Sequence, residues 1–363
     1  MGLKKCLNKY CIPELVEGVI TCELDAVYRD SPRYLIVTPD RRYFEISYSV
    51  KRVVDFIDGR RRVLDIVEEL NYLGFSFSLL DLINVFERFL IPYGIVIIDG
   101  ERLNEAKGVK TTGVSYLRMK KNFISYNHVY LILRVFSNFF RLNICMFILA
   151  AILLSHMHLY TSYQQPVLQL SNTLDVIALC VILVFSTFFH ELGHLSAATH
   201  FGVKSGSIGL GLYLVFPVFY SDISDIWKLN RHKRIVIDVA GVYFNLIFVV
   251  CLYLFYMCFK YDVIILAIYL IDYKTVISLN PFFRFDGYWI LSDATGITNM
   301  RRKSQLLICK LLPRGLQDRV GCDFTTSDLS PKNKIFLVLY AFVCSLFFVC
   351  FSLRTFFVVL RLV

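Results

Sequence analysis

The chain has 363 residues, of which 56% are hydrophobic and 19% charged, and its formal net charge is +10. Such a composition excludes a wholly soluble protein and predicts an integral membrane protein, mainly α-helical. Lysine and arginine cluster beside apolar segments, at 118–121, 231–234 and 301–303, which indicates charges that set membrane topology and argues against nucleic-acid binding.

Residues 1–115 carry charges at ordinary density and predict a small soluble domain. The runs 34–38 and 43–46 flank a turn and predict a β-hairpin. Three helical patterns and a strand follow, at 50–57, 63–70, 82–89 and 94–98. Together they predict a compact α/β unit that resembles a winged helix.

The third helical pattern carries Asp81 and Glu87 with only Arg88, so it lacks the basic face that DNA binding requires. The order of a hairpin and then three helices is similar to the PqqD-like peptide-recognition domains of ribosomal-peptide maturation systems. This resemblance implies that the domain binds a leader peptide as a strand added to the hairpin edge. A plain scaffold role is the alternative.

A basic juxtamembrane segment, 116–141, leads to a predicted membrane domain at 142–363. Five apolar runs match the ~30 Å hydrocarbon core, namely 142–158, 174–197, 235–258, 262–280 and 335–353. No signal peptide is visible near the N-terminus, which is therefore expected in the cytoplasm. The loops that then lie inside, 198–234 and 281–334, hold most of the lysine and arginine. We predict a multi-pass protein of the cell inner (plasma) membrane with about five spans.

The second predicted span contains His190-Glu191-Leu192-Gly193-His194. Helical residues four apart share a face, so His190 and His194 can offer two imidazole nitrogens to one Zn²⁺, with Glu191 beside them. Short motifs also occur by chance, and a helical histidine is more often structural. Because charged side chains in the hydrocarbon cost roughly 2.5–3.5 kcal/mol each, a functional site is favoured here.

A catalytic zinc needs a third protein ligand. His200 lies six residues after His194, at the spacing of metzincins, but Ala197 replaces the turn glycine of that pattern. An unbroken helix would carry His200 about 9 Å farther along its axis. His200 is therefore interpreted as an interfacial histidine.

Asp286 fits the third position better. It precedes Gly287 and follows the helix-breaking Asn280-Pro281, at a predicted depth close to that of the two histidines. A capping aspartate in a turn is the alternative interpretation. Asp222 and Asp225 are rival ligands, but both are expected at the polar cytoplasmic surface.

These residues resemble the site-2 protease group of intramembrane zinc metalloproteases, over roughly residues 140–300. The similarity rests on the HELGH motif, the glycine-containing stretch 206–219, Ala240-Gly241 with Asn245, and Asn280-Pro281 with Asp286-Gly287. It implies that His190, His194 and Asp286 bind zinc and that Glu191 is the general base. Phe285 stands where the group usually has leucine. The sequence segment NPFFRFDGYW is most similar to the corresponding segment of a bacterial subgroup of peptide zinc metalloproteases. This resemblance implies a role in peptide maturation and export.

The leading hypothesis is zinc-dependent peptide-bond hydrolysis, in which Glu191 takes a proton from water and passes it to the leaving amine. A helix hides its carbonyls, so the substrate must be extended, and the stretch 206–219 could pair with it as a strand. The predicted substrate-binding residues are Asn280, Gly209 and Gly211. The expected substrate is a small precursor peptide or a membrane-associated protein. Residues 1–115 are expected to contact a peptide exporter or a maturation enzyme. The rest of the chain is expected to lie in the lipid bilayer.

Two other functions are open. One is regulated intramembrane proteolysis of a membrane-anchored regulator, which the absence of a PDZ-like insert disfavours. The other is a non-catalytic peptide-binding component of an exporter. The intact Glu191 argues against that function, because metal binding alone does not need this base.

Overall fold

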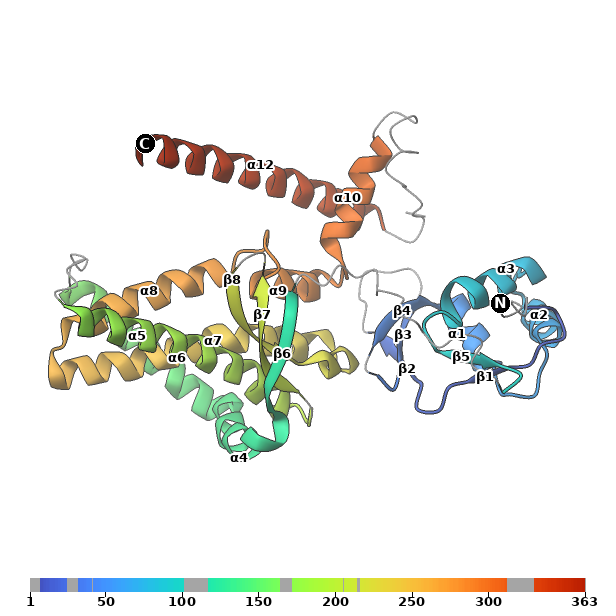
Figure 1. Ribbon diagram of the computed structural model, residues 1–363, viewed down its shortest axis with the longest axis horizontal. Coiled ribbons are helices and arrows are strands. Elements are labelled where there is room, and N and C mark those ends of the chain that lie inside the picture. Colours follow the sequence, from blue (N-terminus) through green and yellow to red (C-terminus); the bar gives the residue numbers. More distant parts are fainter. Residues whose placement is uncertain are drawn as a thin grey trace. The chain divides into compact units, whose positions relative to one another are not determined.

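The computed structural model describes residues 7–24, 32–40, 42–100, 117–163, 172–204, 206–213, 216–311 and 330–362. Contacts within the chain divide it into two compact units, Met1–Ser115 and Tyr116–Val363. Figure 1 shows the elements of both, and each unit is described by itself.

The N-terminal unit combines two small antiparallel sheets with three helices. One sheet pairs β1 (Pro13–Leu15) with β5 (Val96–Ile98), and the other has the order β2-β3-β4 (Ile20–Leu24, Arg33–Val37 and Tyr43–Ser47). The helices are α1 (Tyr48–Asp55), α2 (Val63–Tyr72) and α3 (Leu79–Val85), the last continued by a π-helical turn, η1 (Phe86–Leu90). The predicted hairpin corresponds to β3 and β4. Strands β1 and β2 were not predicted, because they are short and β1 pairs with a partner that is distant in sequence.

The core of this unit lies between the helices and the sheets. Apolar residues at helical spacing, such as Ile66 and Leu70 of α2 and Leu82 and Phe86 of α3 and η1, are fully buried, and Ile36 of β3 packs against the same cluster. The periodicity that predicted the helices is therefore also what builds the core.

The second unit is mainly helical. Its long helices are α4 (Tyr126–Phe136), α5 (Leu142–Ser162), α6 (Thr173–His200), α7 (Arg231–Phe259), α8 (Asp262–Ser278), α9 (Asp286–Thr295), α10 (Met300–Leu311) and α12 (Pro331–Leu362), with 3₁₀ turns η2 (Ser137–Phe140) and η3 (Ser224–Lys228). Helix α7 packs against α5, α6, α8 and α9, which makes it the central helix of the bundle (Figure 1).

Four helices in the described part of the chain are long and apolar enough to cross a membrane: Leu142–Ser162, Thr173–His200, Arg231–Phe259 and Pro331–Arg354. They correspond to four of the five predicted spans. The other predicted span, 262–280, corresponds to α8. This helix has 17 residues, since it ends at Ser278, and it contains the charged residues Asp272 and Lys274. At 1.5 Å per residue it is about 25 Å long, short of the hydrocarbon core. Among the described residues, four of the predicted spans are thus long apolar helices, and the fifth corresponds to the shorter helix α8.

Helices α6 and α7 approach each other closely because each has a glycine at the contact. A Cβ atom on Gly193 of α6 would lie 2.5 Å from the carbonyl oxygen of Ala240 and 2.9 Å from Cβ of Phe244. A Cβ atom on Gly241 of α7 would lie 2.5 Å from Nε2 of both His190 and His194. A side chain at either position would therefore force the two helices apart.

The two strands that follow α6 in the chain join an earlier strand in a three-stranded antiparallel sheet. Its order is β6-β7-β8 (Leu117–Ser125, Ser207–Tyr213 and Phe216–Asp222), so β7 pairs on both sides and β8 has one free edge. The described residues of the glycine-containing stretch 206–219 thus lie mainly in β7 and β8, which pair with each other. Strand β6, in the predicted juxtamembrane segment, completes the sheet.

We expect Gly193→Ala to lower the thermal stability of the protein. Alanine is favoured over glycine in a helix by about 1 kcal/mol, but its methyl group would meet the backbone oxygen of Ala240, and overpacking of this kind costs about 1–3 kcal/mol. The melting temperature in detergent would measure the effect. Cys180→Ala, on an exposed face of the same helix, is the control. An unchanged melting temperature for Gly193→Ala would contradict the close helix contact.

We expect Ser78→Ala to loosen α3 and η1. The Ser78 hydroxyl accepts a hydrogen bond from the Asp81 backbone and donates one to its carboxylate, a reciprocal cap whose loss costs about 1 kcal/mol. The Ser78 side chain and backbone N–H hold the pKa of Asp81 below its usual range, so the cap is complete above about pH 4 and is lost as pH falls through the lowered pKa.

Hydrogen–deuterium exchange of the full-length chain at neutral pH would test the cap. Peptides covering 79–90 should exchange faster in Ser78→Ala than in the wild type. The control is Ser76→Ala, which alters an exposed serine two residues earlier. Equal exchange in both variants would show that the cap contributes nothing.

Candidate functional site

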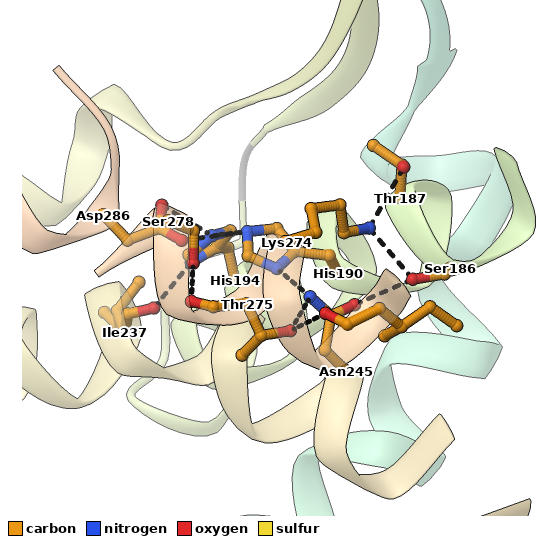
Figure 2. Close-up of polar contacts among 11 residues, drawn as sticks. Ser186, Thr187, His190, His194, Ile237, Asn245, Lys274, Thr275, Ser278 and Asp286 are labelled. Carbon is orange, nitrogen blue, oxygen red and sulfur yellow. Dashed lines mark hydrogen bonds and ion pairs between the residues drawn. The ribbon is translucent and has the colours of Figure 1, made fainter. Parts of the chain in front are cut away.

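Two helices bring together the three side chains that were predicted to bind a metal. His190 and His194 lie one turn apart on α6, and Asp286 is the first residue of α9. The two Nε2 atoms are 3.2 Å apart, and the Asp286 carboxylate oxygens lie 3.0 Å from His190 Nε2 and 3.5 Å from His194 Nε2 (Figure 2). One ligand atom of each residue lies within 4.8 Å of the other two, and both histidines are buried.

Asp286 reaches the histidines through a tight turn after α8. The Asn280 side chain accepts a hydrogen bond from the Phe282 backbone at 2.8 Å, which closes the turn at Pro281. A Cβ atom on Gly287 would lie only 2.0 Å from the Leu279 carbonyl oxygen. The glycine is therefore required for α9 to begin directly against the end of α8, and this position places Asp286 at the metal-ligand group.

A buried ion pair holds α9 on α7. Arg234 donates to both carboxylate oxygens of Asp293, at 2.9 and 2.8 Å, and a third hydrogen bond goes to the Leu229 carbonyl. Both side chains are almost completely buried. Bidentate geometry of this kind fixes orientation as well as distance, so it sets the direction of the helix that begins with Asp286.

Polar groups behind the histidines orient the two rings. His194 Nδ1 lies 2.7 Å from the Ile237 carbonyl oxygen, which accepts its N–H and leaves Nε2 free to bind a metal. His190 Nδ1 lies 3.1 Å from the side-chain amide of Asn245. This amide is fully buried and also bonds Thr275 and Ser186 (Figure 2). Rotating it by half a turn would present its oxygen to an N–H of His190 at the same place.

These residues fit a zinc ion. Two imidazole nitrogens and a carboxylate are the ligand types of catalytic zinc sites, which leave a fourth position open. The Asp286 Oδ2 atom is buried, and its close polar contact, at 3.0 Å, is with Nε2 of His190, an atom that would itself bind the metal. Gly241 leaves open the space beside both Nε2 atoms that any side chain would fill.

The ligand group opens into a cavity of about 720 Å³, which Glu191, Lys274, Asn245 and the edge strand β8 help to line. Glu191 is 9% exposed, and it lies on α6 directly after His190. Trp227 and Trp289 line the same cavity and meet edge to face. The cavity therefore holds Glu191 next to the ligand group, and its walls combine further charged side chains with the two tryptophans.

The other predicted residues lie elsewhere. His200 Nδ1 donates to the Ser137 carbonyl oxygen, 3.0 Å away, and the residue is not part of the ligand group. Asp222 lines the cavity and accepts hydrogen bonds from Ser224, while Asp225 pairs with Lys228.

The predicted substrate-binding residues Gly209, Gly211 and Asn280 do not line the cavity. Gly209 and Gly211 lie on β7, whose backbone is paired on both sides, and it is the neighbouring strand β8 that faces the cavity. A Cβ atom on Gly209 would lie 2.6 Å from the Tyr220 ring, so this glycine makes room for a residue of the cavity wall.

Sequence reasoning missed Lys274 and the Arg234–Asp293 pair. Lys274 stands in an apolar run, and an ionisable residue at that place was a signal of function that could have been used. Arg234 was assigned to a topology-setting cluster in a loop, whereas the structure places it in the first turns of α7 and pairs it with Asp293. No sequence pattern indicated that pairing.

We expect Gly241→Ala to abolish zinc binding. The added methyl group would occupy the space beside both Nε2 atoms and displace at least one ring. Elemental analysis of the purified protein would measure zinc per chain. Val239→Ala, at an exposed position on the same helix, should keep the zinc content of the wild type. Full zinc occupancy in Gly241→Ala would show that the ion does not bind at this position.

Comparison with known proteins agrees with this geometry. The family model for peptidase family M50 matches residues 178–346, a range that contains His190, Glu191, His194 and Asp286. Over 117 residues the chain is 27% identical to "Putative peptide zinc metalloprotease protein YydH" of Bacillus subtilis (strain 168), a match that covers 32% of this chain and 46% of that protein. The chain thus spans about half the length of this relative. No solved structure matches. The site-bearing part of the chain is therefore similar to a family of zinc metalloproteases.

Proposed function

We propose that this protein is a membrane-embedded zinc metalloprotease that cleaves a peptide bond of a small precursor peptide or membrane-associated substrate, in peptide maturation or export. The observation that carries the proposal is the convergence of His190, His194 and Asp286 beside Glu191 in one cavity. Two of the helices that line that cavity, α6 and α7, are long and apolar enough to cross a membrane. The match to peptidase family M50 over this part of the chain supports the same function.

In this proposal, His190, His194 and Asp286 hold the zinc. When bound, zinc supplies Lewis-acid chemistry, which polarises a carbonyl and makes water a nucleophile near neutral pH. The Ile237 carbonyl and the Asn245 amide hold the two imidazoles in orientation.

Glu191 is the proton carrier of the proposed reaction. It accepts a proton from the attacking water and later returns it to the leaving amine, so that no charged amine anion has to leave. Its position directly after His190 keeps the carboxylate in the cavity that the histidines face. A carboxylate at this place has no role in merely holding the metal, since three other side chains already provide ligands.

The substrate is proposed to bind as an extended strand along the free edge of β8. Residues Val218–Asp222 of that strand line the cavity, and their partner strand β7 is already paired on its other side. Backbone hydrogen bonds to a free edge hold a peptide in extended form, which exposes carbonyls that a helix would hide. Gly209 and Gly211 would act indirectly, by shaping the strand behind β8.

The N-terminal unit is proposed to bind the leader of the precursor peptide and to lie in the cytoplasm, with the second unit in the cell inner membrane. In the described part of this unit, β2 and β4 are the outer strands of the sheet β2-β3-β4, and an added strand would pair at one of these two edges. A leader held there would tether the cleavable part of the same peptide to the chain that cleaves it.

We expect Glu191→Gln to bind zinc like the wild type but to cleave nothing. The substitution keeps the shape of the side chain and removes its ability to take up a proton. Zinc by elemental analysis and cleavage of candidate precursor peptides by mass spectrometry would be measured on the same detergent-purified samples. The double variant His190→Ala with His194→Ala should lose both zinc and cleavage.

The outcomes separate the possible functions. Zinc in the wild type with cleavage that Glu191→Gln abolishes is the expected result. A wild type without zinc, or with zinc content unaffected by the double histidine variant, would contradict the metal site. Zinc-dependent cleavage that survives in Glu191→Gln would contradict the role of this carboxylate.

A further inference from the structure

Lys274 is a cation inside the site-bearing bundle that the proposed roles above do not use. It lies on α8, within an apolar run, and its ammonium group donates to the Ser186 hydroxyl at 2.9 Å and to the Thr187 hydroxyl at 3.2 Å. These two residues stand one helical turn before His190 and Glu191 on α6. Figure 2 shows the lysine side chain extending across the site toward them.

We infer that Lys274 is a further catalytic residue, which donates a hydrogen bond to the substrate carbonyl oxygen as negative charge develops on it. This inference rests on the proposed protease function and adds a residue to its chemistry. Lys274 and Glu191 line the same cavity, so a peptide bound in that cavity can contact both side chains.

The hydrogen-bond partners of Lys274 favour this role over a structural one. Both are neutral hydroxyls, so the positive charge is not neutralised by a hydrogen-bonded carboxylate. Two of the three ammonium hydrogens are directed to these hydroxyls, which leaves one donor for a ligand in the cavity. Tying α6 to α8 would need only a neutral donor, and a charged one in an apolar bundle is costly unless the charge is used.

The proposed step balances as follows. The water oxygen forms a bond to the carbonyl carbon, the π electron pair of the C=O bond moves to the carbonyl oxygen, and Glu191 takes one water proton. Lys274 donates a hydrogen bond to the oxygen that now carries the negative charge, without transferring its proton. When the C–N bond breaks, the pair returns to the C=O bond and the Glu191 proton goes to the leaving amine.

A second chain of contacts must be distinguished from this role. Ser186 also donates to Asn245, whose amide lies against His190, so Lys274 is connected to a metal-ligating ring through three hydrogen bonds in series. If the lysine acted only through that connection, its replacement would weaken zinc binding. If it acts on the substrate, its replacement would lower turnover and leave the zinc in place.

The test compares Lys274→Met, Lys274→Gln and the wild type as full chains in detergent. Glutamine keeps an N–H donor that can reach the Ser186 and Thr187 hydroxyls but has no charge. Lys260→Met removes a lysine at the end of α7, which bonds Tyr163 and does not line the cavity, and serves as the control. The probe is a quenched fluorogenic peptide that the wild type cleaves, together with a phosphinic analogue of that peptide, a stable tetrahedral anion.

Both Lys274 variants should show a kcat about 10²–10³-fold below the wild type, with KM and zinc content unchanged. The affinity for the phosphinic analogue should fall in the same proportion, because the analogue carries the charge that the lysine binds. Lys260→Met should behave as the wild type.

Three results would overturn the inference. Unchanged kcat in Lys274→Gln would show that a neutral donor is sufficient, and loss of zinc or of helical content in both variants would assign the lysine a structural role. A zinc-loaded wild type that cleaves no peptide and binds no phosphinic analogue would instead contradict the proposed protease function itself, together with the role of Lys274.

Discussion

The close contact between α6 and α7 is the constraint on which the site depends. Gly193 and Gly241 have no side chains at the contact, so the two helices approach until the imidazoles of His190 and His194 lie directly beside the α7 backbone. The same approach puts the Ile237 carbonyl within hydrogen-bond distance of His194. Small residues at a helix contact therefore determine the ring positions as well as the packing. One glycine of the pair lies inside the histidine motif, so the motif specifies its own supporting contact.

The polar groups of the bundle form connected sets and are not scattered. Arg234 and Asp293 satisfy each other and join α7 to α9, while Ser186, Asn245 and Thr275 join α6, α7 and α8 behind His190. Buried polar side chains are tolerated when their hydrogen bonds are made, and the bonds then hold the helices in one register. Oδ2 of Asp286 is buried against Nε2 of His190, 3.0 Å away, so the two groups that face each other here are both ones that the geometry offers as metal ligands.

Local patterns in the sequence predicted the three helices of the N-terminal unit, the long apolar helices of the second unit, the histidine pair and the choice of Asp286 over His200, but not α4, α9 or α10. Helical spacing fixes which residues share a face, and Asn280-Pro281 with Gly287 marks the turn that returns the chain to the histidines. Interactions between distant segments were not predictable in the same way. The pairing of Arg234 with Asp293, the addition of β6 to the β7-β8 hairpin and the pairing of β1 with β5 each depend on the tertiary fold. Gly209 and Gly211 were predicted to bind substrate because they lie in the glycine-containing stretch. Only the order of the strands in the sheet shows that the neighbouring strand β8 lines the cavity.

The ligand group draws on segments that are far apart along the chain. An ion held by His190, His194 and Asp286 would act as a cross-link that closes a loop of roughly a hundred residues, and closing a loop of that length costs conformational entropy that grows only slowly with its length. Because such an ion binds the folded arrangement and not the open chain, its free concentration would shift the balance between assembled and opened forms of the bundle. The supply of metal in the cell would then control how much of this protein survives quality control after insertion, in addition to how much of it is active.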